Sequence, residues 1–260
     1  MLKALNTAAT GMAAQQTNID VIANNMANVN TTGFRRSRAE FQDLIYQTVR
    51  APGGTSGDGQ SLPTGLQIGQ GTRTVSTEHI HMQGNLSQTG NALDIAIEGD
   101  GFLQVVRPSG EVAYTRAGNL KTDAEGRVVT VDGYAIEPNL SLPPDATSVT
   151  ISADGIISIT QAGQSATSEV GQITLAGFAN PAGLQAIGRS LYIASDASGQ
   201  PIVGGPGEEG LGTLAQGFLE GSNVEVVNEM IDLISSQRAY EVNQRVIQAA
   251  DEMMRRTTDR

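Results

Sequence analysis

The residues that break helices are confined to the middle of this chain. All nine prolines and 28 of the 31 glycines lie between residues 51 and 220. Proline removes a backbone donor and glycine loosens the backbone, so both are rare inside helices and common in turns. The distribution predicts a helix at each end and strands and turns between them. We therefore expect an α+β protein with a central antiparallel β-rich domain.

The N-terminal segment repeats apolar residues at a helical period, with spacings that alternate between three and four. Such residues form one stripe along a helix. The stripe comprises Leu5, Ala8, Met12, Ile19, Ile22, Met26 and Val29. Polar residues then end the pattern, and Gly33 is expected as the C-cap of this helix.

The C-terminal segment carries a broader apolar band, made of two stripes. The first comprises Val226, Leu233, Tyr240, Ile247 and Met254, and the second Ala239, Val242, Val246, Ala249 and Met253. Ser222 or Asn223 is expected as the N-cap. One partner helix buries only a narrow seam, so a band this wide favours burial between molecules over packing within an ordinary domain. We predict that the terminal helices pair as a coiled-coil-like assembly domain, although the two stripes leave their register open.

Strand and turn signals fill the region between the helices. Three hairpins are expected, at 102–115, 127–136 and 148–160, with further strands at 170–178 and 191–193. Short strands at this spacing predict a sandwich or barrel-like body. The predicted domains are residues 1–35 together with 222–260, an extended connector at 36–66 that includes a glycine-rich flexible loop at 51–60, and a β-rich body at 67–221.

Composition argues against several classes of function. Residues 51–220 hold the whole net charge of −11, which disfavours nucleic-acid binding, and the absence of cysteine excludes disulfides and thiol chemistry. His79 and His81 would share one face of a strand without a third metal ligand, so we expect two ordinary surface histidines. We predict no catalytic residues, no metal and no cofactor. No apolar run suits a membrane span, and no cleavable signal peptide is expected at the N-terminus.

Several motifs resemble those of the flagellar axial proteins, the family of rod, hook and hook-associated subunits. The signature lies in residues 22–35 and matches at Asn24, Asn25, Ala27, Asn28, Thr31, Gly33 and Phe34. Met26 and Arg35 stand where the family often has Leu and Lys. Residues 83–102, 114–118, 220–224 and 237–243 are similar to other family motifs. The resemblance follows the chain in order over nearly its whole length.

A further insert resembles that of the distal rod members of the family and includes Tyr46, Gln47, Arg50, Leu62, Pro63 and Gly65. The resemblance implies a structural, non-enzymatic subunit that self-assembles into a helical homopolymer: a rigid hollow shaft that transmits torque from motor to hook. It implies neighbouring proximal rod proteins, hook protein, and periplasmic and outer-membrane ring proteins as partners. It also implies a location in the basal body, from periplasm to outer membrane, reached through the flagellar type III export apparatus.

The sequence also allows other classes of protein. The neighbouring rod protein of similar length, or a short hook protein, shares most of these motifs. A phage-tail-like fibre would also combine terminal helices with β domains, but it would not be expected to carry the Asn-Asn-x-Ala-Asn signature. A β-rich carbohydrate-active enzyme would need a pair of carboxylates in a cleft, and the sequence offers no compelling pair.

Overall fold

The computed structural model describes residues 2–51, 64–161 and 167–258. The fold is α+β, as predicted, with the terminal helices packed on each other and a β-rich central part. The chain divides into two compact units. The helix unit groups Met1–Ala27, Ser37–Glu78 and Glu225–Arg260, and the body groups Asn28–Arg36 and His79–Val224. Residues 67–78, which follow the predicted connector, therefore belong to the helix unit and not to the body.

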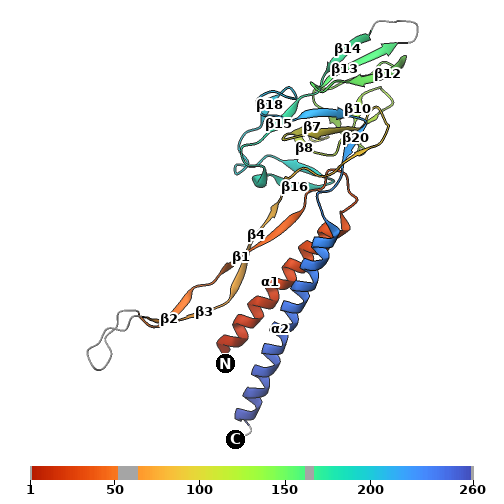
Figure 1. The fold of residues 1–260 in the computed structure, drawn as a ribbon. Helices are drawn as coiled ribbons and strands as arrows, with labels where there is room; N and C mark the ends of the chain where they lie inside the picture. The colour runs from red at the N-terminus through yellow and green to blue at the C-terminus, as the bar shows by residue number, and fades with distance from the viewer. Residues whose placement is uncertain (1, 52–63, 162–166, 259–260) are drawn as a thin grey trace. The chain divides into compact units, whose positions relative to one another are not determined.

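In the helix unit, α1 (Leu2–Ala27) and α2 (Val226–Thr258) lie side by side and run antiparallel (Figure 1). Among the described residues, neither helix combines the length and apolarity that crossing a membrane requires.

Both predicted helix caps are wrong. Gly33 does not cap α1, because that helix ends at Ala27 and a turn closed by Thr31 and Asn28 follows it. Glu225 holds the N-cap position of α2, and its carbonyl accepts the Glu229 N–H at 3.0 Å. Ser222 Oγ accepts the Val224 N–H ahead of the helix at 3.3 Å, and Asn223 forms its hydrogen bonds with segments distant in sequence.

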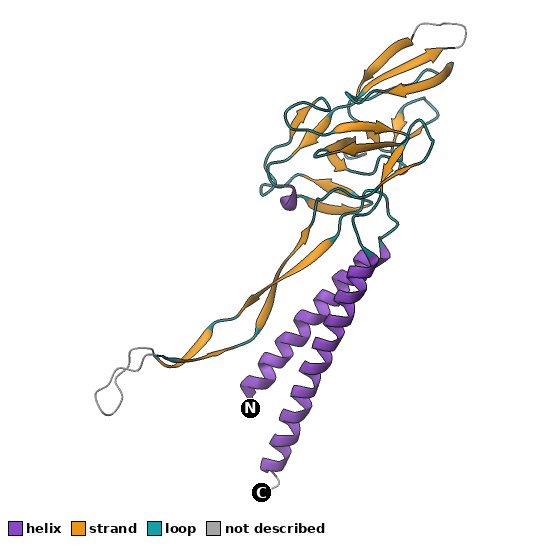
Figure 2. Cartoon of the chain, viewed as in Figure 1, coloured by secondary structure: helices purple, strands orange, loops and turns teal. Residues whose placement is uncertain are grey.

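A long two-stranded ribbon completes the helix unit (Figure 2). Strand β1 (Ser37–Asp43) pairs with β4 (Thr72–His79), and β2 (Tyr46–Arg50) pairs antiparallel with β3 (Leu66–Gly69). The ribbon approaches α1 at Gly71, where a Cβ atom would lie 2.1 Å from the Thr10 hydroxyl. The predicted flexible loop at 51–60 lies almost entirely outside the described residues, as do Leu62 and Pro63.

The body is built around a branched nine-stranded antiparallel sheet. Its main path runs β16 (Gln185–Gly188), β17 (Leu191–Ile193), β8 (Val112–Thr115), β7 (Phe102–Val106), β11 (Ala135–Ile136), β10 (Val128–Val129) and β9 (Lys121–Thr122). Strand β15 (Leu175–Gly177) branches from β7 and carries β18 (Ile202–Gly204). A three-stranded sheet follows, of β12 (Ala146–Ile151), β13 (Ile156–Gln161) and β14 (Thr167–Gln172). Two pairs complete the body: β6 (Ile95–Glu98) with β19 (Thr213–Gln216), and β5 (Leu86–Gln88) with β20 (Phe218–Glu220).

The three predicted hairpins are confirmed. Strands β7 and β8 pair, as do β10 and β11, and β12 and β13. The last hairpin turns at Gly155, whose φ of 82° favours glycine over residues with a side chain.

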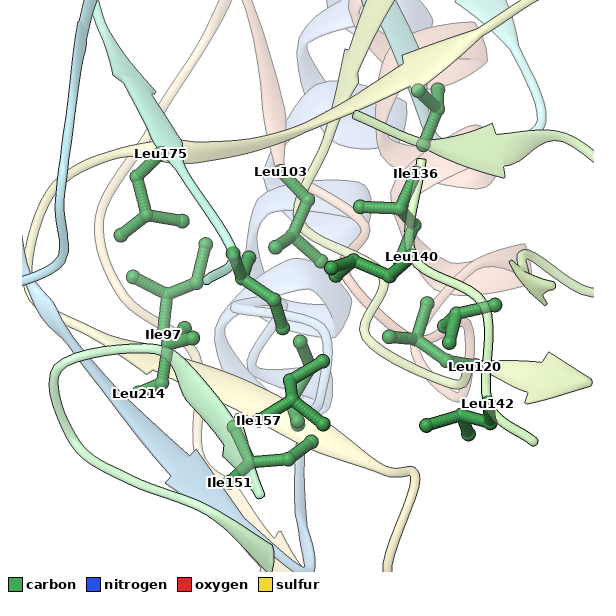
Figure 3. Close-up of a cluster of buried hydrophobic side chains, with 14 of the residues drawn as sticks. Ile97, Leu103, Leu120, Ile136, Leu140, Leu142, Ile151, Ile157, Leu175 and Leu214 are labelled. Carbon is green, nitrogen blue, oxygen red and sulfur yellow. The ribbon is translucent and has the colours of Figure 1, made fainter. Parts of the chain in front are cut away.

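Aliphatic side chains from both sheets, from the β6–β19 pair and from the segments between strands meet in one core (Figure 3). Ile97, Leu103, Ile136, Ile157 and Leu175 are each at most 1% exposed. Truncating a buried leucine of this kind to alanine typically costs about 2–5 kcal/mol. The body therefore buries most of its large apolar side chains in this core, while Val131, Ile202 and Val203 are among those that stay exposed.

Candidate functional site

The apolar stripe predicted on the N-terminal helix is at least partly covered. Ala8 and Ile22 are buried. The remaining helical members are half-buried: Leu5, Met12, Ile19 and Met26. Val29 is also half-buried, but it lies in the turn beyond α1. These side chains therefore face the inside of the helix unit rather than open solvent.

On α2 the two predicted stripes differ in exposure. In the first, Leu233, Tyr240, Ile247 and Met254 are half-buried, and Val226 is 41% exposed. In the second, Val242, Val246 and Met253 are 56%, 44% and 52% exposed. We use "the seam" for the residues of α1 and α2 that face one another. The half-buried members of the first stripe are assigned to the seam, and the exposed Val226 is not.

The exposed apolar face of α2 is longer than the sequence suggested. Val227, Ile231 and Ile234 are 70%, 59% and 47% exposed and continue the second stripe at helical spacing. We call these six residues the α2 stripe: Val227, Ile231, Ile234, Val242, Val246 and Met253. A run of large apolar side chains on one exposed face marks an interaction surface.

The hairpin of β2 and β3 adds a second exposed apolar surface. Ile45 is 83% exposed, Tyr46 is 52% exposed and Val49 is 57% exposed. Of the predicted insert residues, Gln47, Arg50 and Gly65 are also exposed. An isolated two-stranded hairpin is marginally stable in water, so this segment gains from packing against a partner.

The body contains a buried ion cluster. Arg35 donates from Nη2 to Glu220 Oε1 at 2.7 Å, and Arg116 donates from Nη1 to Glu220 Oε2 at 3.4 Å. The Gly84 N–H donates to Glu220 Oε1 at 2.9 Å, and Arg116 Nη2 donates to the Gly99 carbonyl at 2.7 Å. The side chains of Arg35 and Glu220 are 0% exposed, and that of Arg116 is 3% exposed. Buried charges persist only when they are paired in this way.

One carboxylate serves two guanidinium groups in this cluster. Burial lowers the pKa of Arg116 to about 10, while the neighbouring Glu220 carboxylate opposes that shift. The Arg116 guanidinium also lies 5.4 Å from the Phe102 ring centroid, a cation–π distance. Nε and Nη1 of Arg35 have no hydrogen-bond partner within the described part of the chain. Glu220 is therefore the group on which the burial of both arginines depends.

The residues of the N-terminal signature divide between the helix unit and the body. Asn25 is buried in the helix unit, where its side-chain carbonyl accepts the Ser37 N–H at 2.9 Å. Gly33, with φ 68°, donates its N–H to the Glu220 carbonyl, and a Cβ there would lie 2.6 Å from the Ala117 nitrogen. Of the other signature residues, Asn24 is exposed, and Asn28, Thr31 and Phe34 are half-buried.

Asn223 fastens the neighbouring segments of the body. Its side-chain oxygen accepts the Arg36 N–H at 2.7 Å, and its Nδ2 donates to the carbonyls of Ile80 and Met82 at 2.8 and 3.0 Å. Together with the ion cluster, Asn223 joins three segments of the body: the one that precedes β1, the one that follows β4 and the one that precedes α2.

The expectation of two ordinary surface histidines is wrong. His79 and His81 are half-buried, with ring centroids 5.8 and 5.4 Å from that of Tyr192. Burial, with Arg35, His79 and Arg116 nearby, lowers the pKa of His81 to about 4. In the described parts of the chain, no three His, Asp or Glu side chains gather closely enough to hold a metal ion.

Comparisons with known proteins match nearly the whole chain. Residues 5–35 match the model of the flagella basal body rod protein, residues 96–159 that of the flagellar hook protein FlgE/F/G D1 domain, and residues 215–260 that of the flagellar basal body rod FlgEFG protein C-terminal region. The flagellar basal-body rod protein FlgG of Caulobacter vibrioides is 49% identical, over 99% of this chain and 98% of that protein. FlgG of Agrobacterium fabrum is 49% identical over 97% of both chains.

The chain belongs to the FlgG family of flagellar basal-body rod proteins. It is a structural subunit of the basal-body rod, as the motifs implied. A flagellar hook-basal body complex protein of Bacillus subtilis, FlhP, is more distant, at 28% identity over 98% of this chain and 97% of that protein.

Each of the three family matches supplies one member of the ion cluster. Arg35 ends the first match, Arg116 lies in the second and Glu220 in the third. Sequence reasoning found all three motifs but missed that their charged residues meet. The signal available in the sequence was that each motif carries one charged residue within two positions of a glycine, at Gly33, Gly118 and Gly221.

Proposed function

We propose that this rod subunit self-assembles into a rigid, hollow distal-rod homopolymer that transmits torque from motor to hook. The terminal helices would pack in a coiled-coil-like way within each subunit and against those of neighbouring subunits. The observation that carries this proposal is the α2 stripe, whose apolar side chains are exposed in the single chain. Burial of such side chains stabilises by about 25 cal/mol per Å² of apolar surface.

The residues predicted for subunit assembly fall into two groups in this proposal. Those in the seam would fix the helix pair: Leu5, Ala8, Met12, Ile19, Ile22, Met26, Leu233, Tyr240, Ile247 and Met254. Those exposed on α2, among them Val226, Val242, Val246 and Met253, would contact other subunits. The hairpin at Tyr46 would form further contacts between neighbouring subunits.

The ion cluster and Asn223 support force transmission. They hold the segments of the body that continue along the chain into the helix unit. A force that pulls on these segments would therefore have to break hydrogen bonds and ion pairs before the chain could extend. The proposal requires no catalysis.

The proposed surroundings follow from the family. The subunit would adjoin proximal rod proteins and hook protein and rotate inside the periplasmic and outer-membrane rings. The acidic body would face outward toward those rings. Export through the flagellar type III apparatus would deliver it.

The double substitution Val242→Asp/Val246→Asp tests the proposal. Two charges on the α2 stripe would have to be buried between subunits, so rods should be missing from isolated basal bodies and the cells should not swim. The matched control is Gln244→Asp/Gln248→Asp, which adds the same charges at exposed polar positions of the same helix.

The outcome is read from electron micrographs of basal bodies and from motility in soft agar. Normal rods in the stripe variant would contradict the proposed role of α2. Missing rods in both variants would mean that added charge anywhere on α2 is harmful, and the stripe would lose its support.

A further inference from the structure

Two hydrogen bonds cross the seam between α1 and α2, and a close approach of Asn243 to α1 lies at a third level. Asn18 donates from Nδ2 to Ser236 Oγ at 2.8 Å. Asn25 donates from Nδ2 to Glu229 Oε2 at 3.2 Å. At the third level, a Cβ on Gly11 would lie 2.9 Å from Asn243 Nδ2. We call these contacts the polar layers.

The polar layers recur at a fixed interval. Residues 11, 18 and 25 are seven apart on α1, and their partners 243, 236 and 229 are seven apart on α2. Seven residues of helix span about 10.5 Å, so the three levels are evenly spaced along an antiparallel pair. All three contacts agree on a single register.

The layers place three polar side chains in buried positions, while Asn18 and Asn243 are half-buried. Asn25, Glu229 and Ser236 are 1%, 0% and 4% exposed. Polar groups inside a helix pair lower its stability relative to apolar ones, and their best-attested benefit is to specify one partner and one register. An amide without its partner at such a position loses its hydrogen bonds to water without replacement.

The buried face of α2 supplies these partners, since Glu229 and Ser236 are 0% and 4% exposed. On the side of the α2 stripe, Asn228 and Ser235 are exposed, and Val242 stands at the level of Gly11. By apolarity alone α1 could pack on either face, and packing on the stripe would bury more of it. We propose that the polar layers select the face of α2 that packs on α1, in one register, and so leave the α2 stripe to neighbouring copies of the chain. Only this last step rests on the proposed function.

Disulfide formation in the full chain tests the selection, because the chain contains no cysteine of its own. The pair Gly11→Cys/Asn243→Cys reports packing on the seam face. The pair Gly11→Cys/Val242→Cys reports packing on the stripe face at the same level, since successive helical residues are rotated by about 100°. It is made together with Asn243→Ala, so that both reporters lack the third layer and the contact of Asn243 with residue 11. Both pairs are oxidised in dilute solution, and the intramolecular bond is quantified by mass spectrometry. With the Asn18 and Asn25 layers intact, the seam bond should dominate.

The substitution Asn18→Leu mismatches one layer, because Ser236 then faces an aliphatic side chain. The ratio of stripe bond to seam bond should rise at least threefold. The exchange Asn18→Ser/Ser236→Asn restores a matched layer and should return the ratio to its starting value. The control is Gln16→Leu, an equally apolar change at an exposed position two residues away, which should leave the ratio unchanged.

Three results would overturn the inference. The ratio could stay unchanged in Asn18→Leu, or rise equally in Gln16→Leu. Loss of both bonds would show that the layers only hold the helices together and choose no face. These measurements use dilute monomers, so they stand even if the α2 stripe proves dispensable for rods, and that result would remove only the proposed function.

Discussion

The body and the helix unit differ in how far they bury their large apolar side chains. In the body, Leu103 and Leu175 are 0% exposed and Ile157 is 1% exposed, inside a core shared by two sheets. In the helix unit, Val227 and Ile231 are 70% and 59% exposed. The body has a closed core with scattered apolar side chains on its surface, whereas α2 exposes a whole apolar face that the described residues do not cover.

Buried polar groups differ between the units in a similar way. The body holds a buried ion cluster at Glu220, close in sequence to the segments that lead out of it. The helix unit distributes them at even intervals along the seam. The first arrangement fixes a junction, and the second fixes a register.

The largest expected effect is on the body. Glu220→Gln removes the carboxylate that pairs with Arg35 and Arg116 and leaves two buried guanidinium groups without it. The free energy of unfolding of the body should fall by about 3–5 kcal/mol, measured by urea denaturation. Glu98→Gln, at an exposed position, is the control. A loss below about 1 kcal/mol would show that the cluster does not hold the body together.

The pH dependence of unfolding tests the surroundings of the same two arginines. The pKa of His81 is about 4 in the folded chain, against 6.5 ordinarily, so the unfolded chain binds the additional proton between these values. Stability should fall as the pH drops from 6.5 to about 4, by up to about 3 kcal/mol from this residue. The histidine faces Arg35, Arg116 and His79, so protonation adds a further cation to that group. Comparing unfolding in the native chain and in His81→Gln isolates the contribution, and equal pH dependence in both would refute it.

A smaller effect is expected where the three-stranded sheet joins the rest of the body. Gln216 accepts the Ile151 N–H at 3.1 Å and donates to the carbonyls of Val149 and Ala92 at 2.9 and 2.7 Å. Gln216→Leu leaves the backbone groups of β12 without these bonds and should cost about 2 kcal/mol in urea denaturation. Gln88→Leu, at an exposed position of β5, should cost far less. Equal costs would show that Gln216 contributes no special support.

The smallest effect contrasts two neighbouring residues of α2. Val246→Asp changes the exposed stripe and should alter the thermal unfolding of the dilute chain by less than about 0.5 kcal/mol. Ile247→Asp places a charge in the seam and should reduce helix content in circular dichroism. If both variants lost helix equally, the two faces of α2 would not differ as described.

Much of the architecture was predictable from local chemistry. The confinement of proline and glycine to residues 51–220 located both helices, and turns such as Asp154-Gly155 located the hairpins. The cap predictions failed because Asn223 forms hydrogen bonds to Ile80 and Met82, distant in sequence, and Gly33 bonds Glu220. Tertiary partners outweighed the local preference of these residues.

The seam was predicted only in part, for a physical reason. Apolar periodicity marks which faces of a helix avoid water, but it does not say which face meets which partner. Asn18, Asn25, Ser236 and Glu229 look like interruptions in an apolar pattern until the antiparallel register brings them together. The same holds for Arg35, Arg116 and Glu220, which are far apart in sequence and adjacent only in the fold.

Amide hydrogen exchange on the dilute full chain, followed by mass spectrometry, tests the central contrast most directly. Core strands such as β7 and β13 should exchange slowly, at rates set by unfolding of the body, while the amides of α2 should exchange much faster. In assembled rods, α2 should become as protected as the core strands. Equal protection of α2 and β7 in the dilute chain would contradict the account, because the helix unit would then be complete without its neighbours.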